Sequence, residues 1–264
     1  MILKFEKLLN TRDLGGMITS DGRTIKQGML IRSGQLWWAS EADREKLGPM
    51  LGLIFDFRTS REKEEKPDPT FAGVEYIHMS IMDESRAGIS RDKESDEEAV
   101  KSMAGDAADT SSDASVQRMA GLYGEFITNP FMQDRYRIFL KRVLEHEKGA
   151  VLWHCSAGKD RAGFGAVLLE HILGVPKEDQ KADYLATDRY LRPEVEMLLE
   201  MLTKDNPNPN AKANLLPMLS ARPEYFDRLY SEAEKMCGSF DKYVEEVLGI
   251  DEETRQKFKD KYLE

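Results

Sequence analysis

One short segment, HCSAGKDRAG at residues 154–163, holds residue types that can do chemistry on a bound anion. Cys155 is one of two cysteines in the chain, and Arg161 follows it after five intervening residues. A thiolate is a strong nucleophile, and the planar guanidinium of arginine holds two oxygens of a phosphoryl group at once. The spacing therefore predicts attack of Cys155 on phosphorus while Arg161 clamps the oxygens.

The chain around this segment predicts a strand, a tight loop and a helix. The apolar run AVLW comes before it, and FGAVLLEHIL comes after it. We expect a helix to begin near Arg161, so that its N-terminus and the backbone N–H groups of the loop favour an anion at one point. Gly158 allows the tight backbone path. The residues expected to bind phosphate are Ser156, Ala157, Gly158, Lys159, Asp160 and Arg161.

The chemistry expected of such a loop proceeds through a covalent intermediate. Attack by the sulfur of Cys155 gives a phosphocysteine, which water then hydrolyses. Arginine and backbone dipoles neutralise the developing charge, so no metal and no cofactor are predicted. A buried structural cysteine in a strand-to-helix turn is the alternative interpretation.

Composition excludes several other classes of function. The 264 residues are 41% apolar and carry a net charge of −10 with a pI near 5.1, which argues against a nucleic-acid-binding protein. No run approaches the ~20 apolar residues that a membrane helix needs, and the first residues lack the pattern of a signal peptide. Cys155 and Cys237 form neither a disulfide framework nor a CxxC zinc motif. The expected location is cytoplasmic, with non-classical export left open.

Strands alternate with helices along the chain, which favours an α/β fold with a central, mostly parallel sheet flanked by helices. Apolar runs predict strands at 28–36, 51–58, 74–81 and 149–155. Helices are predicted at 40–50 with Ser40 as N-cap, at 130–147, from Arg161 to Gly174, at 223–237 and at 240–264 with an interruption at Gly249. Residues 177–202 are predicted to form two helices that separate near Pro193. One domain over residues 1–264 is expected.

Two segments differ from this regular pattern. Residues 83–115 contain ten acidic and four basic residues, a net of −6, and few apolar ones. We interpret them as a mobile, solvated insertion, with a lid or a partner-docking segment as the alternative. Residues 177–217 are a candidate helical lid only by the family resemblance given below, since ordinary helix packing explains their periodicity equally well.

The segment HCSAGKDRAG resembles the signature loop of the cysteine-dependent protein tyrosine phosphatase superfamily. Its Gly-Lys-Asp-Arg variant is similar to a bacterial branch of atypical tyrosine phosphatases with dual or triple specificity, phosphoinositides included. Four further segments resemble the same branch: NTRDLGG at 10–16, GMLIRSGQL at 28–36, IFDFRTSREKEEKPD at 54–68 and GSFDKYVEEVLGI at 238–250. The resemblance spans nearly the whole chain.

The resemblance implies roles for individual residues. Cys155 is the expected nucleophile, Arg161 the phosphate clamp, and His154 the residue that orients the loop and helps to hold the thiolate. The leaving oxygen needs a proton, and two aspartates are candidates for the acid. Asp83 follows the strand at 74–81, where superfamily members carry the acid, although it also begins the acidic segment. Asp160 lies beside Arg161 and either donates the proton or orients the arginine.

Other positions leave alternatives open. Lys159 adds a positive charge at the rim, either as a solvated side chain or as a contact for a second phosphate. Aspartates and arginines in the family-like segments form either a network that supports the loop or ordinary salt bridges: Arg12, Asp13, Asp56 and Arg58. Ala162 departs from the branch, which has Thr or Ser there. That hydroxyl stabilises the thiolate when phosphocysteine breaks down, so its absence is expected to slow the second step.

The predicted function is therefore hydrolysis of phosphomonoesters. The expected substrates are phosphotyrosine proteins and, further, phosphoserine, phosphothreonine or phosphoinositides. A phosphate-binding module with impaired turnover and an inositol-polyphosphate phosphatase are the alternatives. The sequence does not predict the oligomeric state.

Overall fold

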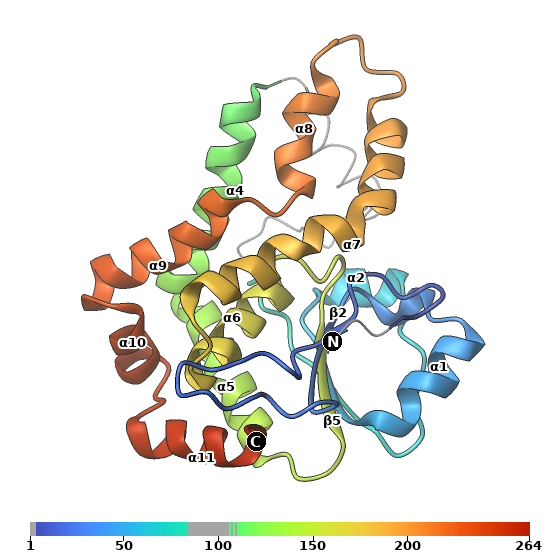
Figure 1. The fold of residues 1–264 in the computed structure, drawn as a ribbon. Helices are drawn as coiled ribbons and strands as arrows, with labels where there is room; N and C mark the ends of the chain where they lie inside the picture. Colours follow the sequence, from blue (N-terminus) through green and yellow to red (C-terminus); the bar gives the residue numbers. More distant parts are fainter. Residues whose placement is uncertain (1–3, 84–105, 107, 109) are drawn as a thin grey trace.

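A computed structural model of the chain describes residues 4–83, 106, 108 and 110–264. Its centre is a five-stranded sheet in the order β1-β2-β5-β3-β4 (Figure 1). β1 runs antiparallel to β2, and the other neighbours are parallel. The strands are β1 Arg12–Asp13, β2 Leu30–Ser33, β3 Leu51–Asp56, β4 Glu75–His78 and β5 Ala150–His154. The predicted α/β fold with a mostly parallel sheet is confirmed.

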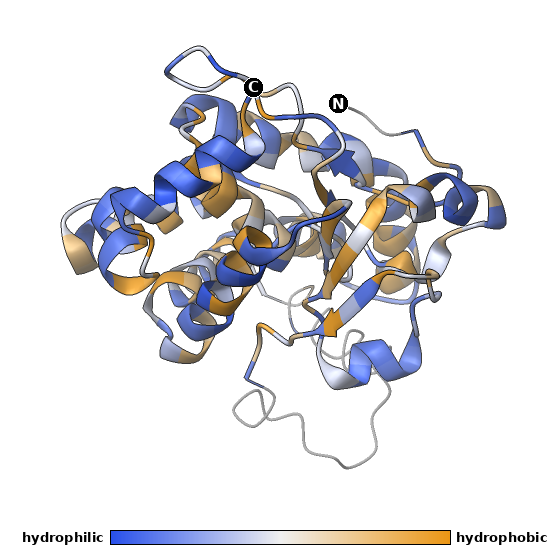
Figure 2. Ribbon diagram, turned by 90° about the horizontal axis from the view of Figure 1, so that it is seen from below, coloured by the Kyte–Doolittle hydropathy of each residue, from blue (hydrophilic) through white to orange (hydrophobic). Residues whose placement is uncertain are grey.

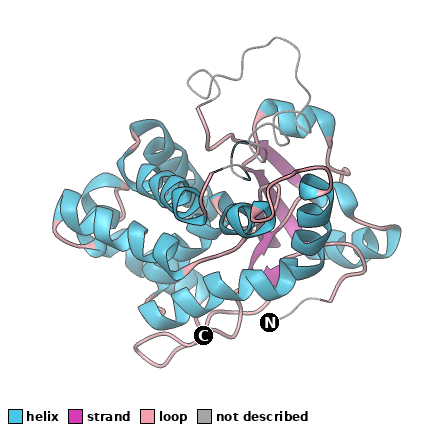
Figure 3. Cartoon of the chain, turned by 90° about the horizontal axis from the view of Figure 1, so that it is seen from above, coloured by secondary structure: helices cyan, strands magenta, loops and turns pink. Residues whose placement is uncertain are grey.

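Helices cover both faces of the sheet, as Figure 3 shows from above. The helices are α1 Glu41–Leu47, α2 Ser60–Glu65, α4 Ser112–Thr128, α5 Pro130–Glu145, α6 Arg161–Leu173, α7 Lys177–Thr203, α8 Ala211–Leu219, α9 Pro223–Cys237, α10 Phe240–Lys242 and α11 Glu252–Tyr262. Short 3-10 turns span Leu36–Trp38 and Gly48–Met50, and Tyr243–Val247 forms a π-helical turn. None of the described helices is both long and apolar enough to cross a membrane.

The apolar core lies on the two faces of the sheet, and Figure 2 shows apolar colours along the strands. On one face Leu53, Phe55 and Trp153 pack against residues of α4, α5 and α6. On the other face Ile54 and Leu152 pack against Leu47 of α1 and its neighbours. Burial of both faces explains why these strands are continuous apolar runs and lack a polar alternation.

The central strand β5 is buried along its whole length. His154, its last residue, pairs in register with Ser33 at the end of β2 and with Asp56 at the end of β3. Three parallel strands thus end side by side. The loop that follows β5 lies at the carboxyl edge of the sheet, where ligands bind in open α/β folds.

Several predicted helix boundaries are confirmed by their caps. Ser40 and Asp43 form a capping box at the start of α1. α6 begins at Arg161 and ends at Gly174, whose φ of 89° gives the left-handed C-cap. Gly249 has a φ of 75° and separates α11 from the preceding helical turns.

The prediction of two helices in residues 177–202 is wrong, because α7 continues through Pro193 to Thr203. A proline inside a helix removes one backbone hydrogen bond and bends the helix without always ending it. Figure 1 shows α7 changing direction between its gold and orange parts. The second part extends beside α8, with which it packs, and α8 also packs against α4.

The predicted insertion at 83–115 falls largely on residues 84–105, 107 and 109, which lie outside the described residues. Its last residues are helical, because α4 begins at Ser112 with Ser111 as its N-cap. Residues near this start contact α8: Asn214 donates hydrogen bonds to the carbonyls of Ala108, at 2.9 Å, and Thr110. The predicted insertion therefore includes the first residues of α4.

Candidate active site

The loop at residues 155–160 is held from outside by hydrogen bonds to its carbonyl oxygens. Three consecutive carbonyls accept them: Ser156 O from Gln35 N at 2.9 Å, Ala157 O from Asn10 Nδ2 at 3.0 Å, and Gly158 O from Arg32 Nη2 at 2.9 Å. In a trans peptide the N–H points opposite to the C=O. These bonds therefore turn the loop N–H groups inward, as in an anion-binding nest.

Gly158 is required by this arrangement. Its φ of 69° lies in the left-handed region, and a Cβ built on it would be 2.5 Å from the carbonyl oxygen of Ser33. Any larger residue would strain the backbone and push the loop away from β2. The loop is thus seated directly on the end of the neighbouring strand.

The N-terminus of α6 points at the same place. Asp160 occupies the N-cap position, yet its side chain makes no capping hydrogen bond. An aspartate there usually accepts a hydrogen bond from the first turn of its own helix. Because Asp160 does not, the first N–H groups of α6 and the positive end of its dipole are left for another anion.

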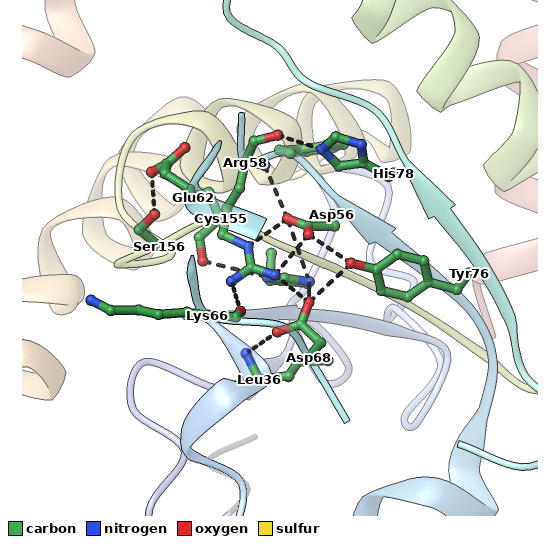
Figure 4. A network of polar contacts seen from close by, with 12 residues as sticks. Leu36, Asp56, Arg58, Glu62, Lys66, Asp68, Tyr76, His78, Cys155 and Ser156 are labelled. Atoms are coloured by element: carbon green, nitrogen blue, oxygen red, sulfur yellow. Dashed lines mark hydrogen bonds and ion pairs between the residues drawn. The ribbon is translucent and has the colours of Figure 1, made fainter. Parts of the chain in front are cut away.

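Cys155 lies at the floor of this cradle. It follows the last residue of β5 and is only 2% exposed. Figure 4 shows it beside Ser156 and Glu62, next to the polar network at the ends of the strands. The predicted nucleophile therefore lies under the inward-facing N–H groups, where a bound phosphoryl group would meet the sulfur.

Arg161 is held by a residue that the sequence did not indicate. The carboxylate of Glu62, in the first turn of α2, accepts from Nη1 at 2.6 Å and from Nη2 at 2.8 Å. The same carboxylate accepts hydrogen bonds from Ser156 Oγ and, at 2.8 Å, from Thr59 N. Burial alone would raise the pKa of Glu62, but Arg161 outweighs it and holds this pKa well below its usual range.

This ion pair uses one edge of the guanidinium. Nη1 also approaches the carbonyl of Phe57 at 3.5 Å, and Nη2 approaches Ser156 Oγ at 3.3 Å. Within the described residues, the Nε of Arg161 donates no hydrogen bond to a protein group. Nε is thus left for an oxygen of a substrate. The T-x-x-E spacing of Thr59 and Glu62 predicts a capping box, but nothing in it predicts the partner 99 residues away.

His154 is embedded in a buried ionic network, of which Figure 4 shows Asp56, Arg58, Asp68 and Tyr76. Its Nε2 lies 3.1 Å from Asp68 and 3.8 Å from Asp56. Arg58 Nη2 lies 2.8 Å from the carboxylate of Asp56 and 2.5 Å from that of Asp68. The Tyr76 hydroxyl donates to Asp56 at 2.6 Å. Burial would raise the pKa of Asp56, but His154 and Arg58 together hold it below its usual range.

Asp56, Asp68 and His154 offer ligand atoms within 4.8 Å of one another, a spacing that a metal ion would accept. Arg58 donates to both carboxylates, however, and supplies the positive charge that a metal would bring. We therefore describe the cluster as an ion-pair network that fixes His154 behind Cys155.

A second network supports the loop from β1, β2 and α7. Asp183 accepts hydrogen bonds from Arg12 Nε and from Arg32 Nη1, both at 2.8 Å, and Arg32 continues to the carbonyl of Gly158. Burial would raise the pKa of Asp183, but the two arginines lower it to about 2. Asp13 belongs to a turn instead, because it accepts from Gly15 N and Gly28 N. The two networks show that Arg12, Asp56 and Arg58 support the site.

Lys159 does not lie at the rim, where the sequence placed it. It is 2% exposed, and its ammonium donates to the carbonyls of Met218 at 2.7 Å and Ser220 at 3.1 Å. These carbonyls belong to the C-terminal end of α8, which attracts a cation. The lysine thus joins the loop to α8. Its predicted contact with a second phosphate is not tested by this position.

The two candidate acids lie on different elements. Asp160 accepts a hydrogen bond from the Tyr123 hydroxyl at 2.6 Å, and Lys159 Nζ lies 3.5 Å away. Asp83 is half-buried, two residues after Ile81, whose N–H donates to the carbonyl of Phe57 at 3.4 Å. Arg161 approaches that same carbonyl, so the chain leading to Asp83 passes close to the site. Both aspartates therefore stay candidates.

Ala162 is fully buried in the first turn of α6, and its carbonyl accepts from Trp153 Nε1 at 2.9 Å. It supplies no hydroxyl near Cys155.

A model described as "Tyrosine phosphatase family" matches residues 3–264. The chain is 29% identical over 252 residues to a protein of Cupriavidus necator named "Putative tyrosine-protein phosphatase", with 94% of this chain and 85% of that protein aligned. It is 26% identical over 266 residues to the triple specificity protein phosphatase PtpB of Mycobacterium tuberculosis, with 93% of each aligned. A tyrosine-protein phosphatase of Nostoc commune is 27% identical over 170 residues, covering 63% of this chain and 51% of the other.

Proposed function

Because the chain belongs to the tyrosine phosphatase family, we propose that it hydrolyses phosphomonoesters through a phosphocysteine formed on Cys155. The observation that carries this proposal is the loop itself. Its carbonyls are bonded outward, α6 begins at its end, and Arg161, whose Nε donates to no protein group among the described residues, lies close to the buried Cys155.

The reaction takes two steps. In the first, the thiolate of Cys155 attacks phosphorus, the P–O bond to the substrate breaks, and the leaving oxygen takes a proton from an acid. In the second, water attacks the phosphocysteine and gives a proton back to the ionised acid, the P–S bond breaks, and inorganic phosphate leaves while the thiolate is restored. Arg161 and the loop N–H groups stabilise the charge of the phosphoryl oxygens in both steps.

The supporting residues have distinct roles in this mechanism. His154, fixed by Asp68 and Asp56, orients the backbone at Cys155. We assign the proton donor to Asp160, because it adjoins Arg161 and its Oδ2 has no protein partner in the described part of the chain. Asp83 is the alternative donor.

The proposed substrates are phosphotyrosine proteins first. Phosphoserine, phosphothreonine and phosphoinositides follow because the chain is similar over 93% of its length to a phosphatase named for triple specificity. A panel tests this range: a phosphotyrosine peptide, a phosphoserine peptide, phosphoinositides and inositol hexakisphosphate, each with wild type, Asp83→Asn and Asp160→Asn. Turnover of the phosphotyrosine peptide with a loss of about a hundredfold in Asp160→Asn supports the proposal. The same loss in Asp83→Asn alone would move the acid to Asp83.

One observation favours a second function. Ala162 brings no hydroxyl to the first turn of α6, and a slow second step would leave a protein that binds phosphate but seldom turns over. The two functions differ in pre-steady-state kinetics. A burst of one product per chain followed by slow turnover shows impaired hydrolysis, whereas binding with no burst would indicate a phosphate-binding module.

A further inference from the structure

The position of Asp160 is set by a residue outside the signature loop. Tyr123, on α4, is fully buried, and its hydroxyl donates to Asp160 Oδ1 at 2.6 Å. This distance is short, as expected when the acceptor is a carboxylate. An aspartate at an N-cap would otherwise turn back to its own helix, and Asp160 makes no such bond. The tyrosine thus determines which way the carboxyl group points.

A second buried tyrosine donates a hydrogen bond to Tyr123. The hydroxyl of Tyr184, on α7, lies 2.7 Å from the hydroxyl of Tyr123. The Tyr123 hydroxyl has one proton, and it goes to the Asp160 carboxylate. Between the two tyrosines, Tyr184 is therefore the donor and Tyr123 the acceptor. Burial raises the pKa of both tyrosines well above the usual value, so both stay protonated donors at every working pH.

The rings around these hydroxyls are packed against each other. Tyr123 and Tyr184 meet edge to face with centroids 5.9 Å apart, and Tyr225 of α9 lies 5.3 Å from Tyr123. All three side chains are at most 1% exposed. Such packing leaves the Tyr123 hydroxyl little freedom to move, which is what positioning to a fraction of an ångström requires.

We propose that Tyr123, oriented by Tyr184, is a positioning residue for the general acid, holding Asp160 through Oδ1 so that Oδ2 faces the leaving oxygen. The inference rests on the proposed function, in which Asp160 is the donor. It adds that the position of the acid is fixed by α4 and α7, two helices outside the loop. Tyr123 touches neither substrate nor the reacting atoms.

Several charged and titratable groups face Asp160 from the elements around it: Lys159, Arg161, Tyr123, Tyr136, Tyr184 and Tyr225. Only Lys159 and Arg161 among these carry a charge at neutral pH, and both stay in place when the Tyr123 hydroxyl is removed. A selective loss of phenyl phosphate turnover in that variant therefore reports the lost hydroxyl.

The test compares Tyr123→Phe with wild type on two substrates. Phenyl phosphate needs a proton on its leaving oxygen, whereas 2,4-dinitrophenyl phosphate releases a stable anion and needs none. We expect kcat/KM for phenyl phosphate to fall about tenfold, the effect of one hydrogen bond to a charged group. The value for 2,4-dinitrophenyl phosphate should stay within about threefold.

Two further variants make the result decisive. Tyr262→Phe removes another buried hydroxyl, which donates to the Val143 carbonyl at 2.7 Å and is far from the loop in sequence. In urea unfolding Tyr262→Phe should lose about as much stability as Tyr123→Phe, but it should keep the wild-type kcat/KM for both substrates. In the Asp160→Asn background, Tyr123→Phe should have no further effect on phenyl phosphate, since the two groups act as one unit.

The outcomes separate the inference from the function on which it rests. Equal losses on both substrates would mean that Tyr123 only stabilises the fold and would overturn the inference. An additive loss in the double variant would overturn it too. Wild-type activity in Asp160→Asn would remove Asp160 from the mechanism and the inference with it. Loss of activity in Cys155→Ser alongside that result would leave the phosphatase reaction itself standing.

Discussion

Glu62 offers the sharpest test of how the guanidinium of Arg161 is held. We consider the substitution Glu62→Gln, which keeps the size of the side chain and removes its charge. The carboxylate accepts four hydrogen bonds, from Arg161 Nη1 and Nη2, Ser156 Oγ and Thr59 N. A glutamine has one acceptor oxygen. Its NH₂ group, wherever it points, faces at least one donor that it cannot satisfy.

The magnitude follows from these contacts. The glutamine oxygen can keep the bonds at the Oε2 position, to Arg161 Nη1 and Thr59 N, so the loss is about one charge-assisted hydrogen bond. That loss costs about 2 kcal/mol and lowers Tm by about 4–8 °C. A guanidinium that is no longer fixed on one edge misaligns with the transition state. We therefore expect kcat to fall about tenfold to a hundredfold.

The effect on binding has the opposite sign. The negative charge of Glu62 also repels the phosphate group of the substrate, so its removal should leave the Ki of inorganic phosphate unchanged or lower it. A fall in kcat without weaker phosphate binding therefore distinguishes lost orientation from a damaged binding site. Steady-state assays with a phosphotyrosine peptide, inhibition by inorganic phosphate and thermal unfolding give the three values.

A matched control exists in α1. Asp43 is the acidic partner of the other capping box and also accepts several backbone hydrogen bonds, but it has no contact with the loop. Asp43→Asn should lose stability and keep kcat. If Glu62→Gln retains the wild-type kcat, or if both variants lose kcat in parallel with stability, the role assigned to Glu62 is refuted.

Two other perturbations have defined outcomes. Ala162→Ser should raise steady-state kcat several-fold and shrink the burst seen in stopped-flow with p-nitrophenyl phosphate; unchanged kinetics would show that the missing hydroxyl does not limit turnover. Glu170 is fully buried, and burial together with neighbouring Asp183 raises its pKa well above the usual value. The folded state therefore keeps a proton that the unfolded state loses above about pH 4.5, so Glu170 costs stability as pH rises. In urea unfolding Glu170→Gln should gain stability relative to wild type between pH 5 and pH 8; an equal difference at both pH values would contradict this.

The chemistry of the loop was predictable because it is local. Cys155, Gly158 and Arg161 lie within seven residues, and the apolar runs on both sides specify the strand and the helix that position them. The register of β5 with its neighbours then places the loop at the carboxyl edge of the sheet. The α/β class could be predicted for the same reason, since strand and helix periodicities are local properties.

The residues that hold the site were not predictable in the same way. Glu62 lies 99 residues before Arg161, and Asp183 lies 171 residues after Arg12. Surface glutamates and aspartates are common, and only the folded topology shows which of them meets a buried arginine. Tyr123 is hidden for the same reason, because a tyrosine on an apolar helix face has the pattern of a core residue.

Two predictions are wrong: that a helix ends near Pro193, and that Lys159 lies at the rim of the site. Pro193 was expected to end a helix, but the bonds it removes are few compared with the contacts that α7 makes along its length with α6, α8 and α9. Lys159 was expected at the rim because lysine is rarely buried. The carbonyls of Met218 and Ser220 accept hydrogen bonds from its ammonium group. These bonds replace the hydrogen bonds to water that the lysine loses when it is buried. The continuous α7 and the buried Lys159 both depend on contacts with residues that are distant in the sequence, which a local pattern does not reveal.

Trapping of the covalent intermediate tests the central claim most directly. Wild-type protein is mixed with a ³²P-labelled phosphotyrosine peptide, quenched in acid within the burst phase, and digested for mass spectrometry. The mechanism predicts label on the peptide that contains Cys155, at up to one phosphate per chain, and none in Cys155→Ser. Label on another residue, or wild-type turnover by Cys155→Ser, would contradict nucleophilic attack by this cysteine.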